Sequence, residues 1–203
     1  SYGKLMKAYY AKQDAEKLSG KGDTSQKLTL MKTSADSLKK SADALNDSSL
    51  WEKKKIKKKD EKTGEEIEVE DYDWDKITKA VKSFVEDYND VVKEAGESNT
   101  KDVLRNASWM TGMTDKNSNM LAKIGITIGK GNKLELDEDA LKQADISSLK
   151  TVFTGYNSFV SKISQKATGI SNAANRASAT YTNNGTYSKT DSSLTSSKID
   201  KEV

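Results

Sequence analysis

Apolar residues recur at alternating intervals of three and four positions in the first part of the chain. After Asp23 and Thr24, either of which can cap a helix N-terminus, this spacing places one apolar stripe on a single helix face. The stripe consists of Leu28, Met31, Ala35, Leu38, Ala42 and Leu45. It predicts an amphipathic helix. The preceding segment, SYGKLMKAYYAKQDAEKLSGKGD, predicts a short helix or a lead-in arm that breaks at Gly20 and Gly22.

Two further helices are predicted in the middle of the chain. Asp73 or Asp75 can cap the first, and Gly96 can end it. Its broad apolar face consists of Ile77, Val81, Phe84, Val85, Tyr88, Val91 or Val92, and Ala95. The second helix is shorter, because Gly112 and the Asn/Ser-rich stretch after it weaken the pattern. Its apolar positions are Val103, Leu104, Ala107, Met110 and Met113.

The apolar period then changes from helical spacing to strict alternation. Ile126 and Ile128 alternate with small or polar residues, as do Leu134 and Leu136, and GKGN lies between the two pairs. This pattern predicts a small β-hairpin with a glycine turn. Asp137 is then placed to cap a short helix through DEDALKQA.

A final helical pattern extends from the N-cap Asp145 to Tyr181. Its apolar positions are Leu149, Val152, Phe153, Tyr156, Phe159, Val160, Ile163, Ala167, Ile170, Ala174 and Ala177. Gly155 and Gly169 each cost about 1 kcal/mol relative to Ala inside a helix, so we expect a kink or break at either. Residues 182–203 are Ser/Thr-rich and predict a frayed tail or the beginning of a truncated helix.

The stretch WEKKKIKKKDEKTGEEIEVEDYDW, from Trp51 to Trp74, is basic in its first half and acidic in its second. A two-residue turn at Thr63 and Gly64 predicts an antiparallel hairpin in which lysines face glutamates. The predicted pairs are Lys62 with Glu65, Lys59 with Glu68, and Lys57 with Glu70. The opposite face then collects Ile56, Ile67 and Val69, which a slip of one residue would separate.

Three interpretations of this Lys/Glu stretch remain open. It can be a self-neutralised, solvated hairpin, a contact surface for a protein partner, or a nucleic-acid binder. Lysines that neutralise phosphates release counterions and drive such binding, but lysines facing glutamates oppose it. We therefore expect no nucleic acid among the partners, and we expect Trp51 and Trp74 to lie near the open end of the hairpin.

The composition of the chain excludes most kinds of catalytic site. The 203-residue chain has no cysteine, histidine or proline, and its net charge of +3 is small beside a charged fraction of 32%. Without Cys or His there is no thiol nucleophile, imidazole base, Cys/His zinc site or disulfide. No GxSxG elbow occurs, and no segment approaches the roughly 20 apolar residues of a membrane helix. We expect no catalytic residue, no metal, no cofactor and no membrane insertion.

Two local motifs allow a ligand as an alternative interpretation. The spacing of Gly125, Gly129 and Gly131 suggests a phosphate loop, but GxxxxGK[ST] is incomplete and a strand-like LEL follows. Calcium is the alternative for the acidic residues Asp137, Glu138, Asp139 and Asp145, but the spacing of an EF-hand is absent. A hairpin turn and helix capping are the favoured interpretations of the two motifs.

Together these patterns predict a mainly α fold, a helical bundle with two small antiparallel β-hairpins. Residues 1–181 are expected to form one domain, with residues 51–74 inserted as a hairpin and residues 182–203 as a tail. Because the chain starts at Ser1 rather than Met, we also expect it to be part of a longer protein.

The order of the segments resembles the C-terminal region of the flagellar filament cap proteins, also called hook-associated protein 2. That family carries an FVxxYN helix, an LxxIGI segment, a glycine turn leading to LxLDE, an LxxA helix and a later phenylalanine. The matching residues are Phe84, Val85, Tyr88 and Asn89; Leu121, Ile124, Gly125 and Ile126; Leu134, Leu136, Asp137 and Glu138; Leu141 and Ala144; and Phe153. The match extends from about Ile77 to Tyr181, and LTLMKTSADSLKKSADALND resembles the family's N-terminal helix.

This resemblance implies a structural protein of the extracellular flagellum, exported through the flagellar secretion channel without a cleaved signal. Copies would assemble at the filament tip, with flagellin and other axial proteins as partners. Relatives carry β-rich head domains where this chain has only residues 51–74. The alternative is a secreted or surface adhesion or interaction module built on the same helical domain, with the hairpin as its adhesive element.

Overall fold

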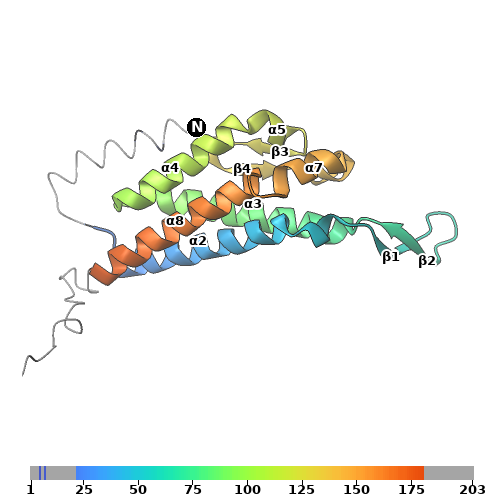
Figure 1. Ribbon diagram of the computed structural model, residues 1–203, viewed down its shortest axis with the longest axis horizontal. Helices are drawn as coiled ribbons and strands as arrows, with labels where there is room; N and C mark the ends of the chain where they lie inside the picture. Colours follow the sequence, from blue (N-terminus) through green and yellow to red (C-terminus); the bar gives the residue numbers. More distant parts are fainter. Residues whose placement is uncertain (1–4, 6, 8–21, 181–203) are drawn as a thin grey trace, which may run out of the picture.

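The computed structural model describes residues 5, 7 and 22–180, and in this part of the chain seven α-helices pack together beside two hairpins (Figure 1). The elements are α2 (Ser25–Asn46), the 3-10 helix η1 (Ser48–Trp51), β1 (Lys54–Lys59), β2 (Glu66–Asp71), α3 (Trp74–Gly96), α4 (Lys101–Lys116), α5 (Ser118–Ala122), β3 (Ile126–Ile128), η2 (Lys130–Asn132), β4 (Leu134–Leu136), α6 (Glu138–Gln143), α7 (Ile146–Phe153) and α8 (Phe159–Thr180). The predicted mainly α bundle with two antiparallel hairpins is confirmed. The predicted arm before Gly22 and the tail 182–203 lie outside the described residues, apart from Leu5 and Lys7.

Helix α2 is central to the bundle because it packs against both α3 and α8. All six positions of its predicted apolar stripe are buried, as expected. Thr24 is the N-cap: its hydroxyl oxygen accepts a hydrogen bond from the Lys27 N–H at 3.2 Å. The apolar stripe therefore carries the tertiary contacts that hold this helix, since propensity alone stabilises helices only weakly.

Two polar contacts fix the register between α2 and α8. The hydroxyl of Ser171 donates to Asp36 Oδ1 at 2.6 Å, and the hydroxyl of Ser164 donates to Asp43 Oδ1 at 2.6 Å. Each aspartate also pairs with the lysine four residues before it in α2. Because both partners recur at heptad spacing, a shift of α8 along α2 by one turn would break both hydrogen bonds.

Helix α3 begins and ends where the sequence predicted, and helix α4 continues past its last predicted apolar position. Helix α3 begins at Trp74 because Asp73 caps it, accepting a hydrogen bond from the Lys76 N–H at 3.0 Å. Helix α4 continues through the buried Gly112 to Lys116. The expected apolar positions of α3 are all buried, which confirms the predicted face.

The last helical pattern breaks at one of its two glycines. Gly155 has a φ of +100°, in the left-handed region that other residues rarely adopt, so α7 ends before it and α8 begins after it. Its N–H donates to Asn46 Oδ1 at 2.8 Å, which joins the break to the end of α2. Gly169 stays inside α8, because a Cβ there would lie 2.6 Å from Asn106 Oδ1 of α4. This glycine permits a close helix contact rather than a bend.

The second hairpin, β3–β4, forms as predicted and is tied to α3 by one side chain. Ile126 lies opposite Leu136, and Ile128 lies opposite Leu134. Asn89 of α3 donates to the Leu134 carbonyl at 2.9 Å and accepts from the Leu134 N–H at 2.7 Å. The amide of Asn89 thus pairs with the outer edge of β4 as a third strand would.

The Lys/Glu hairpin forms, but the predicted register was wrong by two residues. The observed pairs are Lys54 with Asp71, Lys55 with Glu70, Ile56 with Val69, Lys57 with Glu68, Lys58 with Ile67, and Lys59 with Glu66. The turn is longer than two residues because the Asp60 carboxylate accepts from the N–H groups of Lys62 and Thr63, at 2.7 and 3.0 Å. A shift of two residues keeps every side chain on its predicted face.

An aromatic cluster joins the base of this hairpin to the bundle. The rings of Trp51 and Phe153 stack with centroids 5.4 Å apart, and Phe84 contacts the edges of Phe153 and Phe159. Trp51 is buried, and its indole N–H donates to the Leu45 carbonyl at 2.8 Å. The cluster therefore links η1, α3, α7 and α8 at one point, where the hairpin leaves the bundle.

Asp23 joins the beginning of α2 to the loop between α3 and α4. Its carboxylate accepts hydrogen bonds from the Ser98 hydroxyl, the Asn99 N–H, and the N–H and hydroxyl of Thr100, at 2.6–2.9 Å. Burial alone would raise the pKa of Asp23, but these hydrogen bonds together outweigh it and lower the pKa below its ordinary value. The charged form is therefore the one that the fold stabilises.

Asp23→Asn keeps the side-chain volume but replaces one acceptor oxygen by a donor group. We expect a loss of about 1–3 kcal/mol in the free energy of unfolding at pH 7. Since the folded-state pKa is depressed, this stabilisation is complete above about pH 3.9 and declines as pH falls through the lower folded value. Urea unfolding at pH 7 and pH 3 measures the difference, and an equal loss at both pH values would contradict the ionic origin.

Candidate interaction surfaces

The glycines and acids that suggested a ligand have structural roles. Gly131 adopts a φ of +69° in the β3–β4 turn, and a Cβ on Gly125 would lie 2.6 Å from the Asp137 carbonyl oxygen. Asp137 caps α6 by accepting from two N–H groups, at 3.0 and 3.1 Å. Asp145 caps α7 through the Ser148 N–H at 3.1 Å. The hairpin-turn and capping interpretations are confirmed.

Two other kinds of site are not found in the part of the chain that the structure describes. In residues 22–180 no three Asp or Glu side chains gather closely enough to form a metal site. The helices in the same range lack the combined length and apolarity that a bilayer crossing requires.

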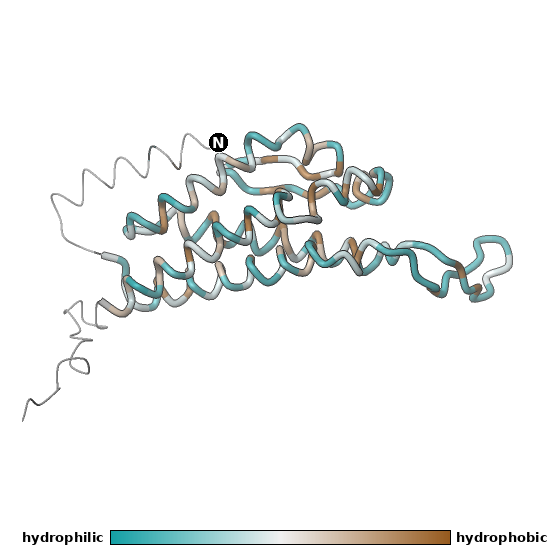
Figure 2. The backbone as a smooth tube through the Cα atoms, in the orientation of Figure 1, coloured by the Kyte–Doolittle hydropathy of each residue, from teal (hydrophilic) through white to brown (hydrophobic). Residues whose placement is uncertain are grey.

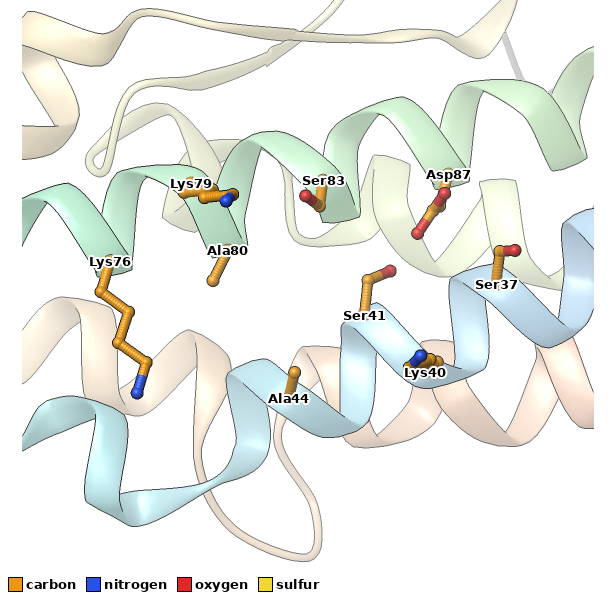
Figure 3. A pocket seen from close by; sticks show the side chains of 9 residues that line it. All are labelled: Ser37, Lys40, Ser41, Ala44, Lys76, Lys79, Ala80, Ser83 and Asp87. Atoms are coloured by element: carbon orange, nitrogen blue, oxygen red, sulfur yellow. The ribbon is translucent and has the colours of Figure 1, made fainter.

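The first candidate surface is a groove between α2 and α3 (Figure 3). It has a volume of about 400 Å³. Its lining residues are Ser37, Lys40, Ser41 and Ala44 of α2 and Lys76, Lys79, Ala80, Ser83 and Asp87 of α3. Small side chains keep the seam between the two helices shallow, and the lysines and Asp87 make its border polar.

Asp87 is the residue of this groove whose pKa is raised. Burial raises the pKa of Asp87, the negative charges of Asp90 and Glu86 raise it further, and a hydrogen bond with the Ser41 hydroxyl opposes them. No sequence pattern marks this group, because DYND has the form of an ordinary polar face of α3. A carboxylate with a raised pKa in a hollow is a candidate functional group.

The second candidate surface surrounds Trp109 of α4. Its side chain is 57% exposed, and Lys166 Nζ of α8 lies 4.4 Å from the centre of its ring. Gly112 and Met113 border the same hollow, of about 400 Å³. Sequence-based prediction missed this residue, although its position outside the apolar stripe of its helix is a signal that could have identified it.

The third candidate surface is the Lys/Glu hairpin itself. It extends from one end of the bundle, and its tube is mostly hydrophilic in Figure 2. Lys58 Nζ lies 2.5 Å from Asp71 Oδ2, whereas Lys57 Nζ is 3.9 Å from Glu66 Oε2. Ile67 is 40% exposed on the other face. Lysines face glutamates across the hairpin as predicted, although in other pairs: Lys55 with Glu70, Lys57 with Glu68, and Lys59 with Glu66.

The raised pKa of Asp87 can be tested through the stability of the fold. Because the folded-state pKa is raised, the ionised carboxylate destabilises the fold above that pKa, and the cost disappears below the unfolded value of about 3.9. Asp87→Asn should therefore raise the thermal midpoint at pH 7 and leave it nearly unchanged at pH 3. Calorimetry at the two pH values measures this, and a lower midpoint at pH 7 would contradict the assignment.

The residues that carry the family resemblance lie together in the structure and are structural. Phe84, Tyr88 and Phe153 belong to the aromatic cluster or border it. Asn89 binds the backbone of β4, and Asp137 caps α6. The apolar members Leu121, Ile124, Ile126, Leu134 and Leu141 are all buried. The shared motifs therefore describe the packing of α3 against the β3–β4 unit.

Comparison with known proteins agrees with this structural role. The family described as flagellar hook-associated protein 2 C-terminus matches residues 98–202, which is more than half of the 203-residue chain. No curated protein and no solved structure matches the chain. The family consists of structural, cap-related proteins of the extracellular flagellum and not of enzymes. The chain belongs to the flagellar hook-associated protein 2 family.

Proposed function

We propose that the chain acts as a cap-type flagellar axial protein, by self-association and by contact with flagellin during filament assembly. The observation that carries the proposal is the family match over residues 98–202. The structure supports it, because Asn89 and the buried motif residues occupy positions that hold the helical scaffold together. The exposed hairpin and the groove along α2 and α3 supply surfaces for partners.

The proposal includes the organisation of the chain. In this proposal residues 1–181 form one helical domain with residues 51–74 inserted as a hairpin, and residues 182–203 are a Ser/Thr-rich tail or a truncated helix. One continuous set of buried residues from α2 to α8 supports a single domain over the described part of that range. The hairpin leaves the bundle between η1 and α3, the place where relatives carry head domains.

The proposed partners and location are those that membership of the family implies. Flagellin and other axial proteins are the proposed partners, and export through the flagellar secretion channel without a cleaved signal is the proposed route. Nucleic acid is not a proposed partner, because every lysine of β1 from Lys54 to Lys59 lies opposite β2, which carries the acids Glu66, Glu68, Glu70 and Asp71.

Deletion of the encoding gene in its source organism tests the proposal. Without a cap, exported flagellin does not fold at the filament tip and is lost to the medium. We therefore expect short or absent filaments and flagellin monomer in the medium. Electron microscopy measures filament length, and immunoblotting of the medium measures the monomer. Restoring the gene on a plasmid is the control.

Normal filaments in the deletion strain would remove the cap function. Binding of the isolated chain to host cells or glycans, together with a nonmotile source, would instead favour the secreted interaction module.

A further inference from the structure

The hairpin β1–β2 has two open edges. Each strand pairs only with the other in the part of the chain that the structure describes, and the ribbon extends away from the bundle (Figure 1). A two-stranded ribbon is marginally stable by itself in water, and its outer edges present unpaired N–H and C=O groups. Both edges are therefore available for the addition of another strand.

The register identifies the residues whose backbone faces outward. The Asp60 N–H donates to the Glu65 carbonyl at 2.9 Å, which makes this pair a hydrogen-bonded one. Such pairs alternate with non-hydrogen-bonded pairs along an antiparallel ladder. The outward backbone groups therefore belong to Lys55, Lys57 and Lys59 on β1 and to Glu66, Glu68 and Glu70 on β2.

The two edges carry opposite charge, and this restricts how they can pair. All three outward residues of β1 are lysines, and all three outward residues of β2 are glutamates. Pairing β1 with β1 of a second copy would set lysine beside lysine, and pairing β2 with β2 would set glutamate beside glutamate. Like charges opposite each other destabilise a sheet, whereas opposite charges stabilise it. Both symmetric pairings are disfavoured.

We propose that β1 of one copy adds to β2 of the next copy, so that neighbouring hairpins join into one antiparallel sheet. The inference rests on the proposed function in taking a second copy of the chain as the partner. Charge complementarity favours a second copy as the partner, since the acidic edge of its β2 can pair with the basic edge of β1. The contact is head-to-tail, so successive copies form a closed ring or an open helix and not a symmetric dimer.

The proposed sheet also improves the burial of apolar side chains. Ile56, Ile67 and Val69 share the face opposite the outward lysines and glutamates, and Ile67 is 40% exposed. In the joined sheet Ile56 and Val69 would form one apolar row across several copies, beside a row in which Ile67 alternates with Lys58. The other face would alternate lysine and glutamate, with an ion pair at every strand junction.

Charge reversal on one strand at a time tests the proposal. The first variant carries Lys55→Glu, Lys57→Glu and Lys59→Glu, and the second carries Glu66→Lys, Glu68→Lys and Glu70→Lys. Each variant has two edges of like charge, so each alone should lose the higher-mass species that the unchanged chain forms. An equimolar mixture should recover it, because acidic edges then meet basic edges. Sedimentation velocity over a concentration series measures the species.

Two controls separate edge pairing from general electrostatic attraction. Lys93→Glu, Lys123→Glu and Lys142→Glu together change the net charge as the first variant does, but these lysines are exposed and lie outside the hairpin. This control should associate like the unchanged chain. Lys57→Pro removes an outward N–H and keeps the bonds inside the hairpin, so it should lose association, whereas Lys57→Thr should only weaken it.

Three results would overturn the inference: an unchanged chain that stays monomeric, a mixture that does not recover although the hairpin of each variant stays folded, or Lys57→Pro that associates normally. Failure of strand addition can be distinguished from failure of the proposed cap function. Hairpin variants that restore full filaments in the deletion strain refute strand addition and leave the cap function intact. Normal filaments in the deletion strain, with recovery in the mixture, refute the cap function and leave strand addition intact.

Discussion

The aromatic cluster around Trp51 is the constraint on which the rest of the structure depends. Trp51 stacks on Phe153, and Phe84 contacts the edges of Phe153 and Phe159. These rings come from η1, α3, α7 and α8, so their packing sets where four elements meet. Aromatic side chains bury a large area each, and edge-to-face geometry adds to that gain. The hairpin leaves the bundle next to this cluster (Figure 1).

The break between α7 and α8 lies between two members of this cluster, Phe153 and Phe159. The Gly155 N–H donates to Asn46 Oδ1, which joins the α7–α8 break to the end of α2, just before Trp51. Asn89, one residue after the buried Tyr88, holds β4 at 2.7–2.9 Å. The bend and the second hairpin are thus both positioned from α2 and α3, which themselves pack on the cluster. The family motif FVxxYN coincides with this region of α3 because its residues perform the packing.

The buried faces could be predicted from the sequence, because burial follows the helical period directly. The six-residue stripe of α2 is an example, and the faces of the Lys/Glu hairpin are another. The hairpin register could not be predicted, since it depends on how the Asp60 carboxylate binds the backbone of the turn. The role of Gly169, a bend in the helix or a close helix contact, could not be predicted from the sequence for a similar reason. Whether a glycine bends a helix or admits a neighbour is decided by Asn106, which is distant in sequence.

The candidate surfaces were less predictable than the fold, because exposure and desolvation arise only when elements meet. Asp87 acquires its raised pKa from burial beside α2, with the charges of Asp90 and Glu86 adding to it. The charges of the Lys/Glu hairpin were visible in the sequence, but the residues whose backbone faces outward are identified by the hydrogen bond from the Asp60 N–H to the Glu65 carbonyl. Charged edges usually protect a sheet from aggregation. When one edge is wholly basic and the other wholly acidic, the same charges oppose symmetric pairing and permit head-to-tail addition. Solubility and directed assembly are then compatible in a single ribbon.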